Sequence, residues 1–170
     1  MTMTINGSGT ITGLSAGGLP SATINQTNLN TNVAGNGPAF SAYLNTNQTG
    51  LTSGVFTKVL FDVENFDTNS NFASSRFTPT VAGYYQINAS LNIGGTLTGS
   101  LVSIFKNGSR YTDGTFFGTV STNVLTVSAV VYCNGSTDYI EIHGYLTGTS
   151  LLFAGSSVGT VVSGAMIRSA

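Results

Sequence analysis

Few side chains in this sequence could carry out chemistry. The chain has one histidine, His143, one cysteine, Cys133, and six acidic residues among 170. A nucleophilic site would have to use His143, which alternates with Glu141 and Tyr145 opposite Ile140, a pattern that favours a surface position on a strand. Cys133 lies in an apolar run, which favours a buried and inert thiol. We therefore expect no catalytic residue and no enzyme.

The acidic residues do not form a recognisable ligand set. Residues 67–71 (Asp-Thr-Asn-Ser-Asn) place oxygens at alternate positions, as in the first half of a calcium loop. However, Phe72 stands where such a loop needs Gly and Thr78 where it needs a bidentate Glu, so a turn with side-chain-to-backbone hydrogen bonds is favoured. Asp62 and Glu64 share a strand face and could touch a cation or be solvated, the second being favoured. We expect no metal and no cofactor.

Composition excludes several classes of protein. Only 6% of the residues are charged, the net charge is −1 and 41% are hydrophobic. This balance argues against nucleic-acid binding, an anionic membrane partner and intrinsic disorder. The apolar stretches are far shorter than the roughly 20 residues of a membrane-spanning helix. The start Met1-Thr2-Met3-Thr4 lacks the basic and apolar regions of a signal peptide, so we expect synthesis and assembly in a cytoplasm.

The distribution of charge divides the chain in two. Ten of the eleven charged residues lie between Lys58 and Glu141. Residues 1–37 are uncharged and rich in Gly, Thr and Asn, with apolar side chains at wide intervals that fit neither helix nor strand. Such a segment either trails loosely or lies as an extended docking arm on another surface, and seven anchors favour the arm. The predicted domains are this arm (1–37) and a folded domain (38–170). The anchors are Ile5, Ile11, Leu14, Leu19, Ile24, Leu29 and Val33.

The folded domain reads as β-structure with period two. Residues 84–93 alternate polar and apolar side chains, as in a half-buried antiparallel strand, and Val59, Phe61 and Val63 do the same. Asn107-Gly108 and Asn134-Gly135 are pairs that can close hairpins. The spacing predicts an all-β antiparallel sandwich or jelly roll. Further strands are expected at 39–44, 101–106, 124–133, 139–146 and 161–167.

The strand at 124–133 has two apolar faces. Leu125, Val127 and Val131 form one, while Val124, Val130 and Tyr132 stand on the other among Thr and Ser. A strand with one face in water does not need apolar side chains on that face. A second copy of the chain packed against this face would explain them. Ordinary β-propensity explains the same residues equally well.

Several segments resemble the globular domain of the complement C1q-like family, which belongs to the tumour-necrosis-factor-like jelly rolls. The resemblance covers about 38–170, in order and at plausible spacing. It is looser at 94–100, and the calcium ligands of the family cannot be placed. The segments are Pro38-Ala39-Phe40-Ser41-Ala42, Phe56-Thr57-Lys58-Val59-Leu60-Phe61-Asp62, Phe66-Asp67, Phe77-Thr78-Pro79-Thr80-Val81-Ala82-Gly83-Tyr84-Tyr85, Ile104-Phe105-Lys106-Asn107-Gly108 and Ser163-Gly164-Ala165-Met166-Ile167.

This resemblance implies a ten-stranded jelly roll that forms a homotrimer about a threefold axis. Under that implication the second apolar face of 124–133 lines the contact between copies, which favours the trimer over plain β-propensity. The implied trimer-interface residues are Tyr84, Val124, Val130, Tyr132 and Met166.

Two segments, 11–20 and 36–43, are similar to parts of bacteriophage virion proteins such as tail fibres. One hypothesis is therefore a trimeric capsid decoration or cement protein on the virion surface, whose arms dock on the major capsid protein or another virion protein. The alternative is a tail- or head-fibre tip that binds a host surface glycan. A fibre needs a shaft, which 37 residues do not supply, so decoration ranks first. A spore-coat or secreted trimer is a third reading, weakened by the missing signal peptide. A glycan could stack on Tyr43, Tyr111, Phe116 and Phe117, although strand aromatics are more often core or trimer contacts.

Overall fold

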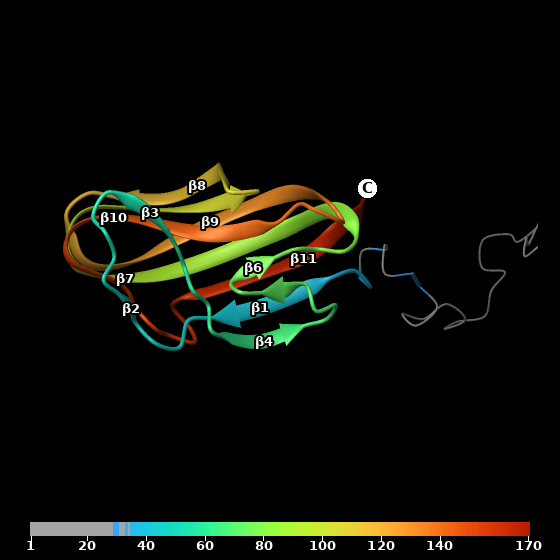
Figure 1. Cartoon of the computed structure of the whole chain (residues 1–170), viewed down its shortest axis with the longest axis horizontal. Helices are drawn as coiled ribbons and strands as arrows, with labels where there is room; N and C mark the ends of the chain where they lie inside the picture. Colours follow the sequence, from blue (N-terminus) through green and yellow to red (C-terminus); the bar gives the residue numbers. More distant parts are fainter. Residues whose placement is uncertain (1–28, 31–32, 34) are drawn as a thin grey trace, which may run out of the picture.

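The computed structural model describes residues 29, 30, 33 and 35–170, with the backbone alone for 120–123. This part of the chain consists of strands and their connections, without a helix (Figure 1). Its eleven strands are β1 (Ala39–Tyr43), β2 (Gln48–Thr49), β3 (Val55–Lys58), β4 (Val63–Asp67), β5 (Phe72–Ala73), β6 (Arg76–Phe77), β7 (Ala82–Lys106), β8 (Ser109–Phe117), β9 (Val120–Asn134), β10 (Ile140–Phe153) and β11 (Val161–Ser169).

The eleven strands form one continuous sheet that folds into two layers, and the longest strand, β7, runs through both. Its first half pairs with β9 on one side and with β11 on the other, and β11 continues to β1 and β4. Its second half pairs with β8 and β10, and β10 also pairs with β2, β3 and β6. We call β4-β1-β11-β7-β9 the first sheet and β8-β7-β10-β3 the second. All these pairings are antiparallel, as the sequence predicts.

The hydrophobic core lies between the two sheets. Alternate side chains of residues 85–93 are buried in it, which confirms the period-two pattern of this strand. They form one cluster with Ile104 of the second sheet and with the aromatic rings that close one edge. Phe40 stacks on Phe72 and Phe77 with ring centroids 4.8 and 4.4 Å apart. Such aromatic contacts add stability beyond the burial of apolar area.

Two segments differ from the expectation. Residues 58–64 do not form one strand, because β3 ends at Lys58 in the second sheet and β4 begins at Val63 in the first. Val59 and Phe61 in the connection are nevertheless buried, so their apolar character reflects a crossing over the core rather than a strand face. Residues 94–100, where the family resemblance is looser, continue β7 rather than form a loop. The positive φ of 124° at Gly95 coincides with a register shift in the pairing of β7 with β9.

The two Asn-Gly pairs behave differently. Asn107 and Gly108 both have positive φ, 53° and 76°, and close the β7-β8 hairpin in which Lys106 faces Ser109, as predicted. In the second pair Gly135 has a positive φ but Asn134 does not. The turn carries the chain from β9 in the first sheet to β10 in the second. The prediction of a hairpin at this second pair was therefore wrong.

Candidate assembly face and charged cluster

The outer surface of the first sheet is uncharged over almost its whole width. Antiparallel pairing aligns its side chains in rows, such as Ser41, Ser163, Asn88 and Ser128 on four neighbouring strands. Charges lie at one end only, where Arg168 pairs with Tyr84 and the ammonium of Lys106 lies 5.6 Å from the centre of the Tyr132 ring. We call this surface the neutral face; its side chains are Val63, Phe66, Ala39, Ser41, Tyr43, Val161, Ser163, Ala165, Tyr84, Gln86, Asn88, Ser90, Asn92, Val124, Thr126, Ser128, Val130 and Tyr132.

Large apolar side chains stand uncovered on the neutral face. Tyr84, Val124, Val130 and Tyr132 are 41, 44, 45 and 41% exposed, and the rings of Tyr84 and Tyr132 pack 5.4 Å apart. The structure therefore brings together four of the five residues expected at a trimer contact. Met166 is the exception.

Met166 is 5% exposed and belongs to the core. It pairs with Tyr85, the core-facing neighbour of Tyr84, so the period of two directs its side chain inward. A Cβ on Gly37 would come within 2.3 Å of its methyl carbon, which shows how closely the chain packs over it. Its assignment to the trimer interface was wrong.

A small polar network lies at the centre of the neutral face. Gln86 donates from Nε2 to Ser128 Oγ at 2.8 Å and to Asn88 Oδ1 at 3.2 Å. Ser128 donates in turn to Asn88 Oδ1 at 2.8 Å. We call these three residues the amide network. They join β7 to β9 through side chains as well as through the backbone ladder.

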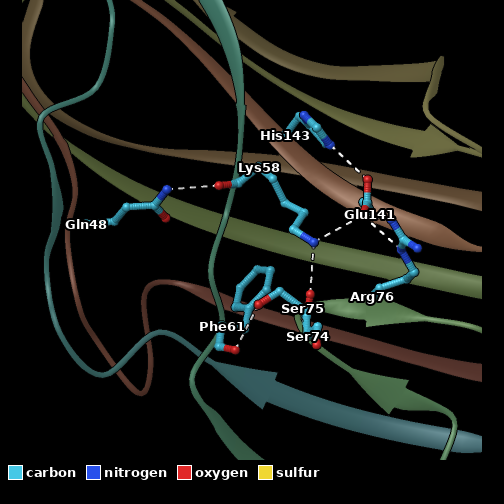
Figure 2. Close-up of polar contacts among 8 residues, drawn as sticks. All are labelled: Gln48, Lys58, Phe61, Ser74, Ser75, Arg76, Glu141 and His143. Atoms are coloured by element: carbon cyan, nitrogen blue, oxygen red, sulfur yellow. Dashed lines mark hydrogen bonds and ion pairs between the residues drawn. The ribbon is translucent and has the colours of Figure 1, made fainter.

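The outer surface of the second sheet holds paired charges instead. Glu141 Oε1 accepts hydrogen bonds from Lys58 Nζ at 3.1 Å and from Arg76 Nη2 at 2.8 Å (Figure 2). His143 Nε2 lies 3.2 Å from the other oxygen, Oε2. Lys58 also donates to the carbonyl of Ser74 at 2.9 Å. This charged cluster therefore ties β3 and the β5-β6 hairpin to β10.

The charged cluster keeps its carboxylate ionised. Glu141 is 7% exposed, and burial alone would raise its pKa. The hydrogen bonds from Arg76, His143 and Lys58 outweigh burial, so the pKa of Glu141 lies below its usual value. An ionised carboxylate with three donors is suited to holding strands together and poorly suited to general acid catalysis. No local sequence pattern indicates this cluster, because Arg76 and Lys58 lie 65 and 83 residues from Glu141 along the chain.

His143 is not the surface histidine that the alternation suggested. Its side chain is 15% exposed, and its ring stacks on Phe105 of β7 with centroids 4.0 Å apart. On the other side it pairs with Lys58 of β3. Burial lowers its pKa despite the nearby Glu141 carboxylate. Nδ1 is buried and has no hydrogen-bond partner in the described part of the chain, which fits a neutral ring with its proton on Nε2.

A second charge pair completes this surface. Arg110 and Asp113 form a two-bond salt bridge on β8, and Ser103 Oγ donates to Asp113 Oδ1 at 2.7 Å. The Arg110 guanidinium lies 5.1 Å from the ring centre of Phe56. We call the charged face the surface formed by Phe56, Lys58, Arg76, Ser103, Phe105, Arg110, Asp113, Glu141, His143 and Tyr145.

The arrangement of strands matches known structures. The globular domain of zebrafish complement 1qA aligns with a TM-score of 0.57 and 19% identity, over 78% of this chain and 99% of that one. Murine APRIL at pH 8.0 gives 0.61 and 10%, over 76% and 98%. Eiger TNF from S. frugiperda gives 0.59 and 9%, over 78% and 93%. The chain has the tumour-necrosis-factor-like jelly-roll fold. No family model and no curated protein sequence matches it.

Two other groups that could act as nucleophiles lie in settings unsuited to catalysis. Cys133 is buried, and burial raises the pKa of its thiol to about 12, so it is a poor nucleophile. The segment Gly155–Gly159 has the Gly-x-Ser-x-Gly spacing of a nucleophile elbow. The serine of this spacing is Ser157, which lies in a turn between β10 and β11 without the helix that such an elbow needs.

The acidic residues considered as cation ligands accept backbone hydrogen bonds in different turns. Asp67 accepts from the backbone nitrogens of Asn69 at 3.3 Å and Phe72 at 2.7 Å, which confirms the predicted turn. Asp62 accepts from the backbone nitrogen of Asn45 at 2.6 Å. Within the described residues, no three His, Cys, Asp or Glu side chains gather as a metal site. The same residues include no helix long and apolar enough to cross a membrane.

The four aromatic residues proposed for sugar stacking do not form one surface. Tyr43 lies on β1 in the first sheet, whereas the other three are on β8 in the second. On β8, Tyr111 and Phe116 are exposed, while Phe117 packs against the core. A single stacking platform from this set was therefore a wrong prediction.

Most of the predicted arm falls outside the described residues. This applies to Ile5, Ile11, Leu14, Leu19 and Ile24. The two remaining anchors, Leu29 and Val33, are exposed.

Proposed function

We propose that the protein is a non-enzymatic structural component of a bacteriophage particle. In this proposal it is a capsid decoration or cement protein that forms a homotrimer through the neutral face. Its N-terminal segments attach the trimer to the major capsid protein or to another virion protein. The observation that carries the proposal is the set of four exposed Tyr and Val side chains on an uncharged sheet face.

The chemistry of the neutral face suits a contact between identical copies. A partner with many charged groups would have to desolvate them against a surface without countercharges, which costs free energy. A second copy presents the same uncharged surface and has no such cost. Exposed apolar side chains gathered on one sheet face are typical of interaction surfaces. A cyclic contact between copies therefore explains both features with one partner.

The position of the chain ends suits attachment by the N-terminal segment. The start of β1 and the C-terminus lie at the same end of the jelly roll (Figure 1). Ala39 pairs with Ala165, and the nitrogen of Met166 donates to the carbonyl of Pro38 at 3.0 Å, so the chain enters the fold beside its last strand. Segments that precede residue 38 in three copies would thus leave from one end of a parallel trimer and could reach a common surface.

Attachment is tested with a deletion and a matched variant of full length. Particles that lack the protein are incubated with the full chain, with a chain lacking residues 1–37, or with a chain whose seven anchors are replaced by Ser. We expect both altered chains to remain trimeric and to be absent from repurified particles, because the apolar anchors provide the attachment. Normal attachment of the chain lacking residues 1–37 would remove this segment from the mechanism.

One observation favours the second function, a fibre tip that binds a host glycan. A hollow of about 400 Å³ is lined by Thr49, Gly50, Leu51 and residues 150–152, where β2 meets β10. This region lies at the end of the molecule opposite the C-terminus (Figure 1). Its volume is within the range of small-ligand sites. If it binds a glycan, the full chain should bind in a glycan array and the Leu51→Arg variant should not, whereas absence of binding by the full chain would exclude this function.

A further inference from the structure

The amide network on the neutral face has unused hydrogen-bonding groups. Gln86 Nε2 and Asn88 Oδ1 point toward each other and toward Ser128. The opposite ends of the two amides, Gln86 Oε1 and Asn88 Nδ2, have no partner within the described residues. One is an acceptor and the other a donor of two hydrogens. In a free copy both ends can be hydrated, because Asn88 is exposed and Gln86 is half-buried.

Covering the neutral face would remove this water. A buried amide group without a partner is costly, whereas a hydrogen bond made in its place offsets most of that cost. The neutral face of a second copy supplies the matching set, because it offers an acceptor on Gln86 and donors on Asn88. A cyclic contact can join the donor of each copy to the acceptor of the next, so that three copies satisfy all six groups.

The shape of the face leaves room for this contact. Two hollows flank the row that contains Asn88 and Ser163, one of about 480 Å³ toward β8 and β9 and one of about 260 Å³ toward β4. Their lining on the neutral face is mostly small, with Ser, Thr and Ala side chains. Phe66 borders the smaller hollow and is itself exposed. Small residues beside protruding ones allow copies to approach closely at the amide network and to interlock around it.

We infer that the amide network of Gln86, Asn88 and Ser128 sets the register of the homotrimer and its restriction to three copies. The inference rests on the homotrimer proposed above. The apolar side chains of the neutral face supply attraction in many relative positions, because hydrophobic contacts are not directional. Only the position in which the amides meet their counterparts avoids burying them unsatisfied. A polar group inside an apolar contact is known to fix register and oligomeric state in this way.

The test separates the strength of association from its stoichiometry. Native mass spectrometry across a dilution series gives both for each variant. Asn88→Val leaves Gln86 and Ser128 facing an apolar side chain, so we expect the trimer to dissociate at a concentration about tenfold higher or more. The triple variant Gln86→Leu, Asn88→Val, Ser128→Ala removes the polar groups together. It should associate at least as strongly as the wild type but populate more than one oligomeric state.

Thr126→Val is the matched control. It makes the same polar-to-valine change on the neutral face, but the Thr126 hydroxyl bonds within its own copy, 3.1 Å from Thr115 Oγ1. We expect this variant to remain a single trimer with less than a threefold change in the dissociation midpoint. A triple variant that forms only trimers, or an Asn88→Val variant as stable as the wild type, would overturn the inference while leaving the homotrimer standing. A monomeric wild type would overturn the homotrimer and the inference together.

Discussion

The two outer surfaces of the jelly roll differ in how far their polar groups are paired within the chain. On the charged face, Glu141 and Asp113 each meet a cation and further donors from their own chain, and aromatic rings cover what remains. On the neutral face, the amide groups and the apolar side chains stay partly uncovered. A surface whose charges are paired within its own chain gains little from a partner, whereas one that leaves amide and apolar groups open gains from being covered. The contrast shows which side of the sandwich is suited to assembly.

The largest expected effect comes from placing a charge on the neutral face. Tyr132→Asp should dissociate the trimer, because each copy would bury a new carboxylate at a cost of roughly 3–5 kcal/mol. The nearest cation, Lys106, lies 5.6 Å from the Tyr132 ring centre and is already paired with Asp138 at 2.9 Å. Tyr132 is exposed in the single chain, so the variant should still fold. Light scattering gives the mass. Val55→Asp on β3 is the control, because Val55 is similarly exposed but belongs to the second sheet; a trimeric Tyr132→Asp variant would refute the placement of the contact.

A substitution in the charged cluster should affect folding and leave assembly intact. Glu141→Leu removes the acceptor shared by Lys58 and Arg76, and we expect the free energy of unfolding to fall by about 3 kcal/mol. Urea denaturation at fixed protein concentration measures this loss. Glu64→Leu, at an exposed acidic position on β4, should change it by less than about 0.5 kcal/mol. Equal effects of the two substitutions would show that the cluster does not hold the strands.

The single histidine should give the charged face a distinct pH dependence. The pKa of His143 is lowered in the fold, so below about pH 6.5 the unfolded chain takes up a proton that the folded chain does not. Stability should therefore fall as the pH drops from about 6.5 toward the folded-state pKa, by at most about 1.4 kcal/mol per pH unit. Urea denaturation of His143→Gln between pH 7 and 5.5 should show no such slope, and an unchanged slope would argue against this assignment.

The smallest expected effect is that of salt on assembly. Because the charges at the neutral face are confined to one end, at Arg168 and at Lys106 beside Tyr132, screening has few interactions to weaken there. We expect the dissociation constant of the trimer to change by less than about threefold between 0.05 and 0.5 M NaCl, measured by sedimentation. A change of more than tenfold would mean that charged residues make the contact.

The alternation of side chains along a strand predicted both the core-facing residues and the residues on the outer face. Alternation along 84–93 predicted which side chains enter the core, and the second apolar set at 124–133 indicated a face beyond that core. Both follow from local geometry, since successive side chains of a strand point to opposite sides. The same rule, applied to the pairing with Tyr85, would have placed Met166 inside. Met166 was assigned to the interface because the resemblance of the whole segment was applied to each of its residues.

The charged cluster could not be predicted in the same way. Alternation correctly set Glu141 and His143 opposite Ile140, but it does not tell which neighbouring strands flank them. That depends on β3 and the β5-β6 hairpin reaching β10, which is a long-range property of the topology. A solvent-facing histidine and a stacked one have the same local sequence.

Sedimentation equilibrium of the full chain, over concentrations from nanomolar to micromolar, tests the central claim most directly. The neutral face predicts a species with three times the 17.5 kDa mass of the chain. A mass of one chain at every concentration would contradict the account, because the exposed Tyr and Val side chains would then have no identical partner.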